Sequence, residues 1–558
     1  MRLRSCWHAR LRAAGLVLAT AVAVPADAQT TATGTCADTA RLAAADFATS
    51  DRDLARVLQL AGALPAAPAL HRRAGTEREL PVCRDAARFL DWALEDAPGV
   101  SRRGVRLLPV VAEMESNSSY RKDRNNGGFR GGVGPSVALG AAVEFRWKGI
   151  TAVLAPRFVR ERNSDFPTVA VVRPGYSPFV YPYQQGGYLI DFPQRFGTEA
   201  DTRVEPGQSY LRFGTRHFEA GASTENFWLG SAQVYPILVS ATAPGFPHLF
   251  IGTVEPLDLW IAKVGVHAVV GRLSESDFFD TLDDNDVRFF SAAVVEVSPR
   301  WIPGLQLGVA RVIEEVVPPD GLSMGHYVGS ALNPGFTFRG GGNPIESNGI
   351  GALLARWVFP DAGFEAYAEW SREDTPYDLR DLLEEPDWTQ AYTLGFHQLV
   401  TLEPVRLRWY GELVHLGEAA PVRAGKGLAS YYTHTRVPQG HTHQGQILGA
   451  SPGPGSDAQI FGVDGFHAWG WSGLWLERTR YDEDTYYRRW ARIYGESRHD
   501  VELGIGLRHA MALGPLWVGG ELLYNRRANR AFLGMEDRTL PRQVNTNLGL
   551  RLRVAWRP

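Results

Sequence analysis

Hydrophobic and polar residues alternate strictly near the C-terminus of the chain. Over positions 547–556, one face carries Leu548, Leu550, Leu552, Val554 and Trp556, and the other carries Asn547, Gly549, Arg551, Arg553 and Ala555. A period of two indicates a β-strand with one apolar face. Similar runs recur after position 105, for example at 364–370 and 406–413. Alternating segments of about ten residues, separated by turns, are typical of transmembrane β-barrels.

The connections between these runs alternate between short and long. A short turn at Lys148-Gly149 precedes a long connection over 163–208, and further long connections span 117–134 and 417–456. Bacterial outer-membrane barrels have short periplasmic turns and long extracellular loops, with an even number of strands. The pattern therefore predicts an all-β, antiparallel transmembrane β-barrel of about 18 strands over residues 104–558.

The first 28 residues have the features of a secretion signal. Four arginines precede an apolar run, Ala13 to Val24, that is too short to cross a bilayer as a helix. Ala26-Asp27-Ala28 is a small-residue cleavage site, so we expect a signal peptide over 1–28 and a mature chain from Gln29. An uncleaved anchor is the alternative.

A segment of different character lies between the signal and the barrel. Its apolar residues recur at helical spacing after Ser50 and again over 84–97, with a linker at 65–81. We expect a small α-helical domain over residues 29–103. An even strand count returns both ends of the barrel to the periplasm, which places this domain there.

Only Cys36 and Cys83 remain after removal of the signal. Two cysteines in an oxidising compartment are expected to form a disulfide. Two reduced thiols are the alternative.

Composition excludes several classes of protein. No later stretch approaches the ~20 apolar residues of a membrane helix. Removal of the signal takes away four arginines and one aspartate, leaving 54 basic against 60 acidic residues, a charge of −6. That balance is not the basic footprint of a nucleic-acid-binding protein.

No catalytic constellation stands out, so we expect no enzyme activity and no cofactor. His434, His441 and His443 cluster, but no cysteine or carboxylate joins them at metal-ligand spacing, and we expect no metal. An outer-membrane enzyme acting on lipid or glycan would need a paired carboxylate site, for which Asp482 to Asp484 is the best candidate.

The long connections are rich in basic and aromatic residues. Arg130 and Phe129 lie in the first, and the second is crowded by Tyr176, Phe179, Tyr181, Tyr183 and Tyr188. Aromatic faces stack on sugars, while arginines hydrogen-bond hydroxyls and carboxylates. This chemistry favours an acidic polysaccharide ligand. The alternative is that the aromatic residues pack the loops against each other.

Two segments, 213–253 and 431–455, resemble the Wzi capsule assembly family in sequence. Glu369-Trp370, Glu373-Asp374 and Glu412 also resemble it, as does the helical N-terminal segment. The resemblance implies an outer-membrane barrel with a periplasmic helical bundle and a lectin-like role in holding capsular polysaccharide. Asn226 and Trp228 are the family-like positions on the third long loop. Leu229-Gly230-Ser231 departs from members that carry a second tryptophan and a Gly-Pro there.

We therefore expect a barrel in the cell outer membrane that binds capsular or other surface polysaccharide and helps to attach or assemble it. The expected partners are that polysaccharide, outer-membrane lipid and periplasmic export machinery. The predicted polysaccharide-binding residues are Tyr120, Arg121, Lys122, Arg124, Asn226, Trp228, Tyr431, Tyr432, His434, His441 and His443. The alternative function is a porin-like channel for sugars or small solutes, and the discriminator is whether loops occlude the lumen.

Overall fold

The computed structural model describes residues 39–42, 50–65, 70–73, 82–96, 103–183, 189–283, 285–317, 321, 347–373, 379–402, 404–418, 430–495 and 497–557. These residues all belong to one compact unit, Asp38–Pro558. The predicted signal peptide and Cys36 lie outside the described residues.

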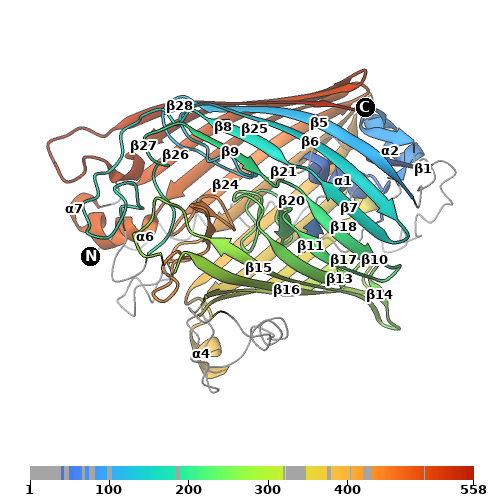
Figure 1. Cartoon of the computed structure of the whole chain (residues 1–558), viewed down its shortest axis with the longest axis horizontal. Coiled ribbons are helices and arrows are strands. Elements are labelled where there is room, and N and C mark those ends of the chain that lie inside the picture. The colour runs from blue at the N-terminus through green and yellow to red at the C-terminus, as the bar shows by residue number, and fades with distance from the viewer. Residues whose placement is uncertain are drawn as a thin grey trace, which may run out of the picture. The chain divides into compact units, whose positions relative to one another are not determined.

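An antiparallel sheet closes into a barrel (Figure 1). Its strand segments are β5 (Arg103–Asn117), β6 (Gly134–Trp147), β7 (Ile150–Leu154), β8 (Arg157–Glu161), β9 (Asp201–Glu205), β10 (Tyr210–Gly214), β11 (Phe218–Ser223), β13 (His248–Thr253), β14 (Leu257–Asp258), β15 (Ala262–Ser274), β16 (Val287–Pro299), β17 (Leu305–Val316), β18 (Ser347–Phe359), β19 (Phe364–Glu373), β20 (Gln390–Leu402), β21 (Val405–His415), β24 (Asp457–His467), β25 (Gly470–Tyr481), β26 (Asp500–Leu513), β27 (Leu516–Ala528) and β28 (Val544–Trp556). β28 pairs with β5, and β7 pairs with β10, which closes the sheet. Three strands are interrupted, as β7/β8, β9/β10 and β13/β14, so the described barrel has 18 strands, as predicted.

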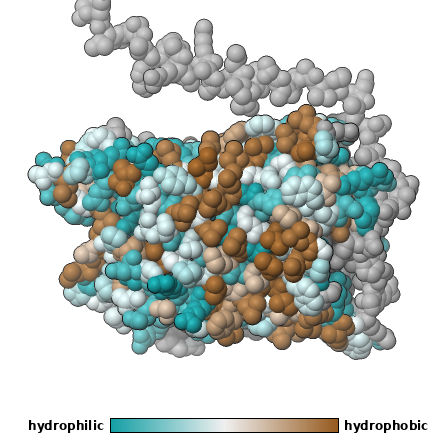
Figure 2. Space-filling model, turned by 90° about the horizontal axis from the view of Figure 1, so that it is seen from above, coloured by the Kyte–Doolittle hydropathy of each residue, from teal (hydrophilic) through white to brown (hydrophobic). Residues whose placement is uncertain are grey.

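The wall of the barrel is apolar outside and polar inside. On β28, the side chains of Leu548 and Trp556 are 49% and 43% exposed, whereas Asn547 faces the lumen and is buried. Figure 2 shows apolar side chains gathered across the wall. An outward apolar band matched to lipid is the defining surface of a transmembrane barrel, and it confirms the predicted fold class.

The two ends of the barrel differ in the length of their connections. At the short-turn end, Lys148 and Gly149 both have positive φ, 45° and 89°, as a two-residue hairpin turn requires. The opposite, long-loop end carries the connections that follow β5, β8, β11, β15, β17, β19, β21, β25 and β27. The short elements within or beside these loops are β12 (Phe227–Leu229), β22 (Thr442–His443), β23 (Gln446–Ile447), α4 (Leu379–Glu384), α6 (Glu483–Thr485), η4 (Tyr486–Trp490), α7 (Ala491–Tyr494) and η5 (Arg530–Phe532).

One predicted long connection is shorter than expected. Residues 201–205 form β9, which pairs with β8, so the prediction of an uninterrupted loop over 163–208 was wrong. Pro156 lies in the break between β7 and β8, and Pro206 lies in the break between β9 and β10. Proline has no N–H to donate to the ladder, so each break sits where the sequence removes a donor.

The N-terminal segment is only partly helical. Helix α1 (Ser50–Leu60) forms as predicted and buries Leu54, Val57 and Leu58. The second predicted helix is α2 (Arg84–Ala87) followed by η2 (Arg88–Ala93), and it ends early. The residues that follow form strand β4 (Leu94–Asp96) and do not continue the helix. Strand β4 pairs with β1 (Thr39–Leu42), which also pairs with β3 (Val82–Cys83). Among the described residues, no helix has the length and apolar character needed to cross a membrane.

The N-terminal segment also contacts the lumen of the barrel. Arg56 donates to Glu365 on β19 at 2.8 Å and to the carbonyl of Ser231 at 2.8 Å. Strand β2 (His71–Arg73) pairs with β12. Figure 1 shows α1 and α2 at one end of the barrel and α6 and α7 at the other. Cys83 is disulfide-bonded, and its predicted partner Cys36 lies outside the described residues.

Candidate functional site

Two lumen glutamates hold the loop over residues 224–247 inside the barrel. Glu412 on β21 accepts hydrogen bonds from the backbone N–H groups of Gln233, Val234 and Tyr235, at 2.7, 3.0 and 2.5 Å. Glu369 on β19 accepts from Ala232 and Ile237 in the same loop, at 2.6 and 2.9 Å. Each buried carboxylate thus satisfies backbone donors that would otherwise be costly to bury.

Residues 430–456, which lie between β21 and β24, pack onto this first loop. Tyr432 donates from its backbone N–H to Glu373 at 2.7 Å and from its hydroxyl to the carbonyl of Ile237 at 2.6 Å. The ring of His441 lies between Glu314 and the carbonyl of Leu238, at 2.7 and 2.6 Å. We call the described residues of the two loops, 224–247 and 430–456, the plug.

Seven of the eleven predicted polysaccharide-binding residues are buried in the loops: Tyr120, Asn226, Trp228, Tyr431, Tyr432, His441 and His443. Each of these side chains makes at least one hydrogen bond within the chain. Trp228 Nε1 donates to the carbonyl of Ala232 at 2.9 Å, and Asn226 Nδ2 donates to that of Ala243 at 2.9 Å. Glycan contact by these seven side chains stays a prediction, and the structure shows them supporting the loops.

The basic residues of the first long loop reach into the barrel mouth. Lys122 pairs with Glu477 at 2.6 Å and with Glu502, while Arg124 pairs with Glu477 at 2.6 Å. Burial disfavours the ammonium of Lys122, but the two carboxylates raise its pKa well above the ordinary value. Arg121 lies 4.7 Å from the ring centroid of Phe192. His434 is partly exposed and accepts from the N–H of Val437 at 3.2 Å.

A pocket opens between the long loops, with a volume of about 130 Å³. Arg121 and Lys122 line it, so the structure brings together two of the predicted residues there. The remaining wall combines aromatic rings with charged groups and includes Phe166, Tyr181, Tyr183, Phe192, Tyr481, Asp482, Arg527 and Arg530. Aromatic faces next to guanidinium groups are the combination that we expected to bind an acidic sugar.

The charge of the pocket is set by buried pairs. Arg527 donates two hydrogen bonds to Asp500, both at 2.7 Å, and stacks 3.7 Å from the ring centroid of Tyr481. Burial raises the pKa of Asp482 to about 6, and the hydroxyl of Tyr181 donates to this carboxyl group. Burial also lowers the pKa of Arg530 to about 10, which leaves it charged at neutral pH.

Arg530 lines this pocket. Its guanidinium lies 5.7 Å from the ring centroid of Tyr120 and 5.6 Å from that of Phe166, and one terminal nitrogen donates to the carbonyl of Pro167. Within the part of the chain that the structure describes, its Nε has no hydrogen-bond partner.

Sequence reasoning noted Tyr181 and Tyr183 but missed Arg527 and Arg530. Tertiary packing brings Arg527 and Arg530 close to the two tyrosines, which lie far away in the sequence. Tyr183, for example, donates to the carbonyl of Ala531, 348 positions later. No local motif marks them. Over the described residues, no group of three or more histidine, cysteine, aspartate or glutamate side chains is placed to hold a metal ion.

Comparison with solved structures shows which known proteins share this fold. Wzi of Escherichia coli, a carbohydrate-binding β-barrel involved in group 1 capsule assembly, matches with a TM-score of 0.58 and 10% identity, over 91% of this chain and 99% of that one. The chain has the fold of Wzi. OccAB2 of Acinetobacter baumannii matches with a TM-score of 0.37 and 9% identity, over 80% and 97% of the two chains. OccK2 of Pseudomonas aeruginosa matches with 0.38 and 10%, over 81% and 97%. No protein-family model matches the sequence, and no curated relative matches it.

Proposed function

We propose that this outer-membrane barrel binds an acidic capsular or surface polysaccharide at its long-loop end and helps to attach or assemble it at the cell surface. The observation that carries the proposal is the pocket lined by Arg121, Tyr181, Arg527 and Arg530. It is a recess between the loops that a barrel presents to the exterior, and no reaction is needed to explain it.

The chemistry of the pocket suits a sugar that carries a carboxylate. Arg121, Lys122, Arg527 and Arg530 line the pocket together with Asp123, Asp482 and Asp500, and Lys122 is further compensated by Glu477 and Glu502. Protonation of Asp482 makes the charge of the pocket more positive. A charge-assisted hydrogen bond from the guanidinium group of Arg530 to a carboxylate would anchor the sugar. The rings of Tyr181 and Phe192 would stack on the apolar face of the sugar.

The size of the pocket limits how much of a polymer it holds. On the same measure of volume, a cavity that holds one water molecule has roughly 10–15 Å³. About 130 Å³ therefore accommodates one sugar ring, and the rest of the chain would lie across the outer loops. Those loops present further pairs of a cation and a ring, with Arg173 at 4.5 Å from Tyr176 and Arg498 at 4.7 Å from Tyr494.

The predicted residues divide between contact and support under this proposal. Arg121, Lys122 and the partly exposed His434 would contact the glycan. The buried seven would hold the loops in place, as would Arg124, which pairs with Glu477 outside the pocket. An export partner in the periplasm and placement of residues 29–103 there also remain proposals. The alternative, a porin-like channel, is disfavoured by the plug, whose loops cross the lumen at Glu369 and Glu412.

The test is binding of the organism's own surface polysaccharide by the purified, detergent-solubilised barrel. We expect Arg530→Gln to weaken binding by about tenfold, the value of one charge-assisted hydrogen bond. Arg216→Gln is the control, because Arg216 pairs with Glu255 at 3.6 Å beside the short turn between β10 and β11, at the end of the barrel opposite to the pocket. Equal binding by wild type and Arg530→Gln, or equal loss in both variants, would overturn the assignment of this pocket.

A further inference from the structure

The wall of the barrel is interrupted in its long-loop half. Strands β11 and β13 pair with each other from Ser223 and His248 toward the short-turn end, and β15 continues past this level to Ser274. On the other side of the interruption, β9 pairs only with β8 among the described residues. The sheet therefore closes through β10, β11 and β13 in the short-turn half (Figure 1), and a gap separates β9 from the end of β15 in the other half.

A cavity of about 290 Å³ lies at this gap. Glu205 at the end of β9 and Ser274 at the end of β15 both line it, so the cavity reaches both borders of the gap. The plug contributes residues 244–245 and 443–444 to the lining. Gln444 is exposed, whereas its neighbours His443 and Gly445 are buried. One plug residue is thus uncovered where the plug meets the gap.

The cavity is lined by residues from both faces of the wall. Successive residues of a strand face opposite sides of a sheet. On β6, Ala142 faces the lumen and is buried, Ala141 faces outward and is exposed, and both line the cavity. Between β7 and β8, the buried Ala155 and the exposed Pro156 line it in the same way. The outward neighbour Val143 is 42% exposed in the apolar band, so the cavity reaches the lipid-facing side at the middle of β6.

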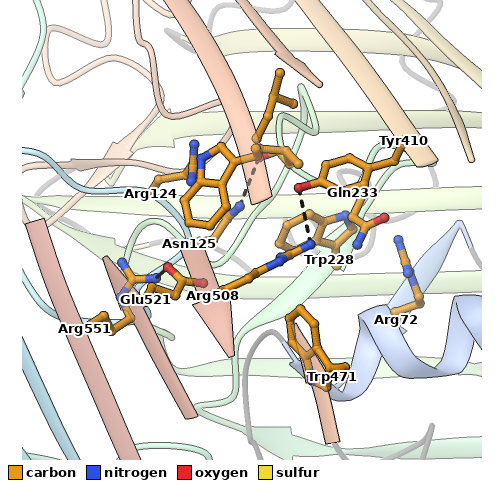
Figure 3. Close-up of a pocket in the computed structure, with 13 residues that line it drawn as sticks. Arg72, Arg124, Asn125, Trp228, Gln233, Tyr410, Trp471, Arg508, Glu521 and Arg551 are labelled. Atoms are coloured by element: carbon orange, nitrogen blue, oxygen red, sulfur yellow. Dashed lines mark hydrogen bonds and ion pairs between the residues drawn. The ribbon is translucent and has the colours of Figure 1, made fainter. Parts of the chain in front are cut away.

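The cavity beneath the plug has a different wall (Figure 3). The strand residues that line it face the lumen, among them Tyr410, Trp471, Trp475 and Arg508. That cavity belongs to the lumen, whereas the cavity at the gap joins the lumen side of the wall to the lipid side.

The charged groups on the lumen side of the gap cavity are paired with one another. Arg157 pairs with Glu113 at 2.9 Å and lies 4.0 Å from Glu205, and Arg553 pairs with Glu113 at 3.4 Å. Two guanidinium groups and two carboxylates line the cavity, so their formal charges cancel. Such a lining does not select a charged ligand, and its outer part consists of alanine and proline side chains.

We propose that this gap admits an acyl chain of a membrane lipid, which lies against Ala141, Ala142, Ala155 and Pro156. Acyl chains surround the apolar band of a transmembrane barrel. A void beside them would forfeit dispersion contacts that an entering chain restores. An apolar cavity of about 150 Å³ holds one benzene molecule, so about 290 Å³ corresponds to an alkyl segment of about twelve carbons. The polar end of the lipid would lie toward Ser274 and Gln444, at the long-loop side.

The test is photolabelling of the purified barrel in vesicles of phosphatidylcholine that carries a diazirine on one acyl chain, with the adducts mapped by mass spectrometry. We expect adducts on the lumen-facing cavity residues Val111 and Ala142 as well as on outward-facing Val143. Trp475 is the internal comparison, because it faces the lumen from the wall of the enclosed cavity and should carry no adduct. Labelling confined to outward-facing residues, or equal labelling of Ala142 and Trp475, would overturn the proposal.

Ala142→Phe tests the route by filling the cavity from its lumen side. The adduct on Val111 should be lost in this variant, while that on Val143 stays. Val143→Phe is the matched control, since it adds the same ring one position along β6 on the outward face and should leave the adduct on Val111 unchanged. Persistence of the Val111 adduct in Ala142→Phe, or its loss in both variants, counts against the proposal. If Ala142→Phe does not fold, the wild-type map decides the question alone, and neither result depends on polysaccharide binding.

Discussion

Glu412 on the barrel wall accepts a 2.7 Å hydrogen bond from the backbone N–H of Gln233, 179 positions earlier in the chain. The same carboxylate accepts from the next two N–H groups of the loop and from the hydroxyl of Tyr367 at 2.7 Å. One side chain thus joins three consecutive backbone N–H groups of the loop to the wall of the barrel.

Removal of these carboxylates should open the barrel. We expect the double variant Glu369→Ala, Glu412→Ala to conduct ions in planar bilayers far more than wild type, because five backbone N–H groups lose their acceptors. Each lost bond to a charged group weakens the attachment of the loop by about 1.5–3 kcal/mol.

Glu144→Gln is the control for a changed lumen charge. Glu144 pairs with Arg146 on the same strand at 2.9 Å and has no described bond to the plug, so its loss should leave conductance at the wild-type level. A double variant that stays as closed as wild type would contradict the role given to Glu369 and Glu412.

Stability should fall as pH rises through the titration of Glu275, on the outer loop after β15. Burial is the main cause that raises its pKa to about 8, with smaller contributions from Asp191, Asp280 and Asp286, while Gln439 opposes it. The pKa in the unfolded chain is about 4.3. The stability contributed by the protonated form is therefore complete below about pH 4.3 and is lost progressively up to about pH 8.

Glu275→Gln keeps the side chain neutral and isolates this effect. Its melting temperature should match wild type at pH 4 and exceed it at pH 9, when both are followed by intrinsic fluorescence. A constant difference between the two proteins across that range would show that Glu275 does not titrate in this window.

The disulfide of Cys83 provides a test of the predicted pairing. We expect a non-reduced digest to yield a Cys36–Cys83 cross-linked peptide by mass spectrometry. The bridge closes a 48-residue segment and is worth roughly 4 kcal/mol in the chain-entropy model. Cys83→Ser should therefore make the N-terminal segment more susceptible to protease. Free thiols at both positions in the mature protein would refute the pairing.

The wall of the barrel was predictable because every strand that crosses lipid needs apolar side chains on its outward face. Leu548 and Trp556 face outward for the same reason as every second residue elsewhere, so alternation alone identifies the strand. The interruption at Pro206 was missed, since β9 is only five residues long and a short strand before a proline resembles a loop.

The candidate site was less predictable, because contacts between loops depend on packing and not on local sequence. Basic and aromatic residues identified the loops that line the pocket. The side chains of Tyr432 and Trp228, however, are buried within the plug and do not line that pocket. Arg530 joins the pocket from a turn that follows β27, and no spacing in the sequence links it to Tyr181.

The most direct test of the proposed function is where the surface polysaccharide goes in living cells. We predict that cells carrying Arg530→Gln together with Arg121→Gln release more polysaccharide into the medium than cells carrying Arg216→Gln, a change at the short-turn end of the barrel, at equal amounts of folded barrel in the outer membrane. An unchanged division between cell-bound and released polysaccharide would contradict a role for the long-loop pocket in holding it.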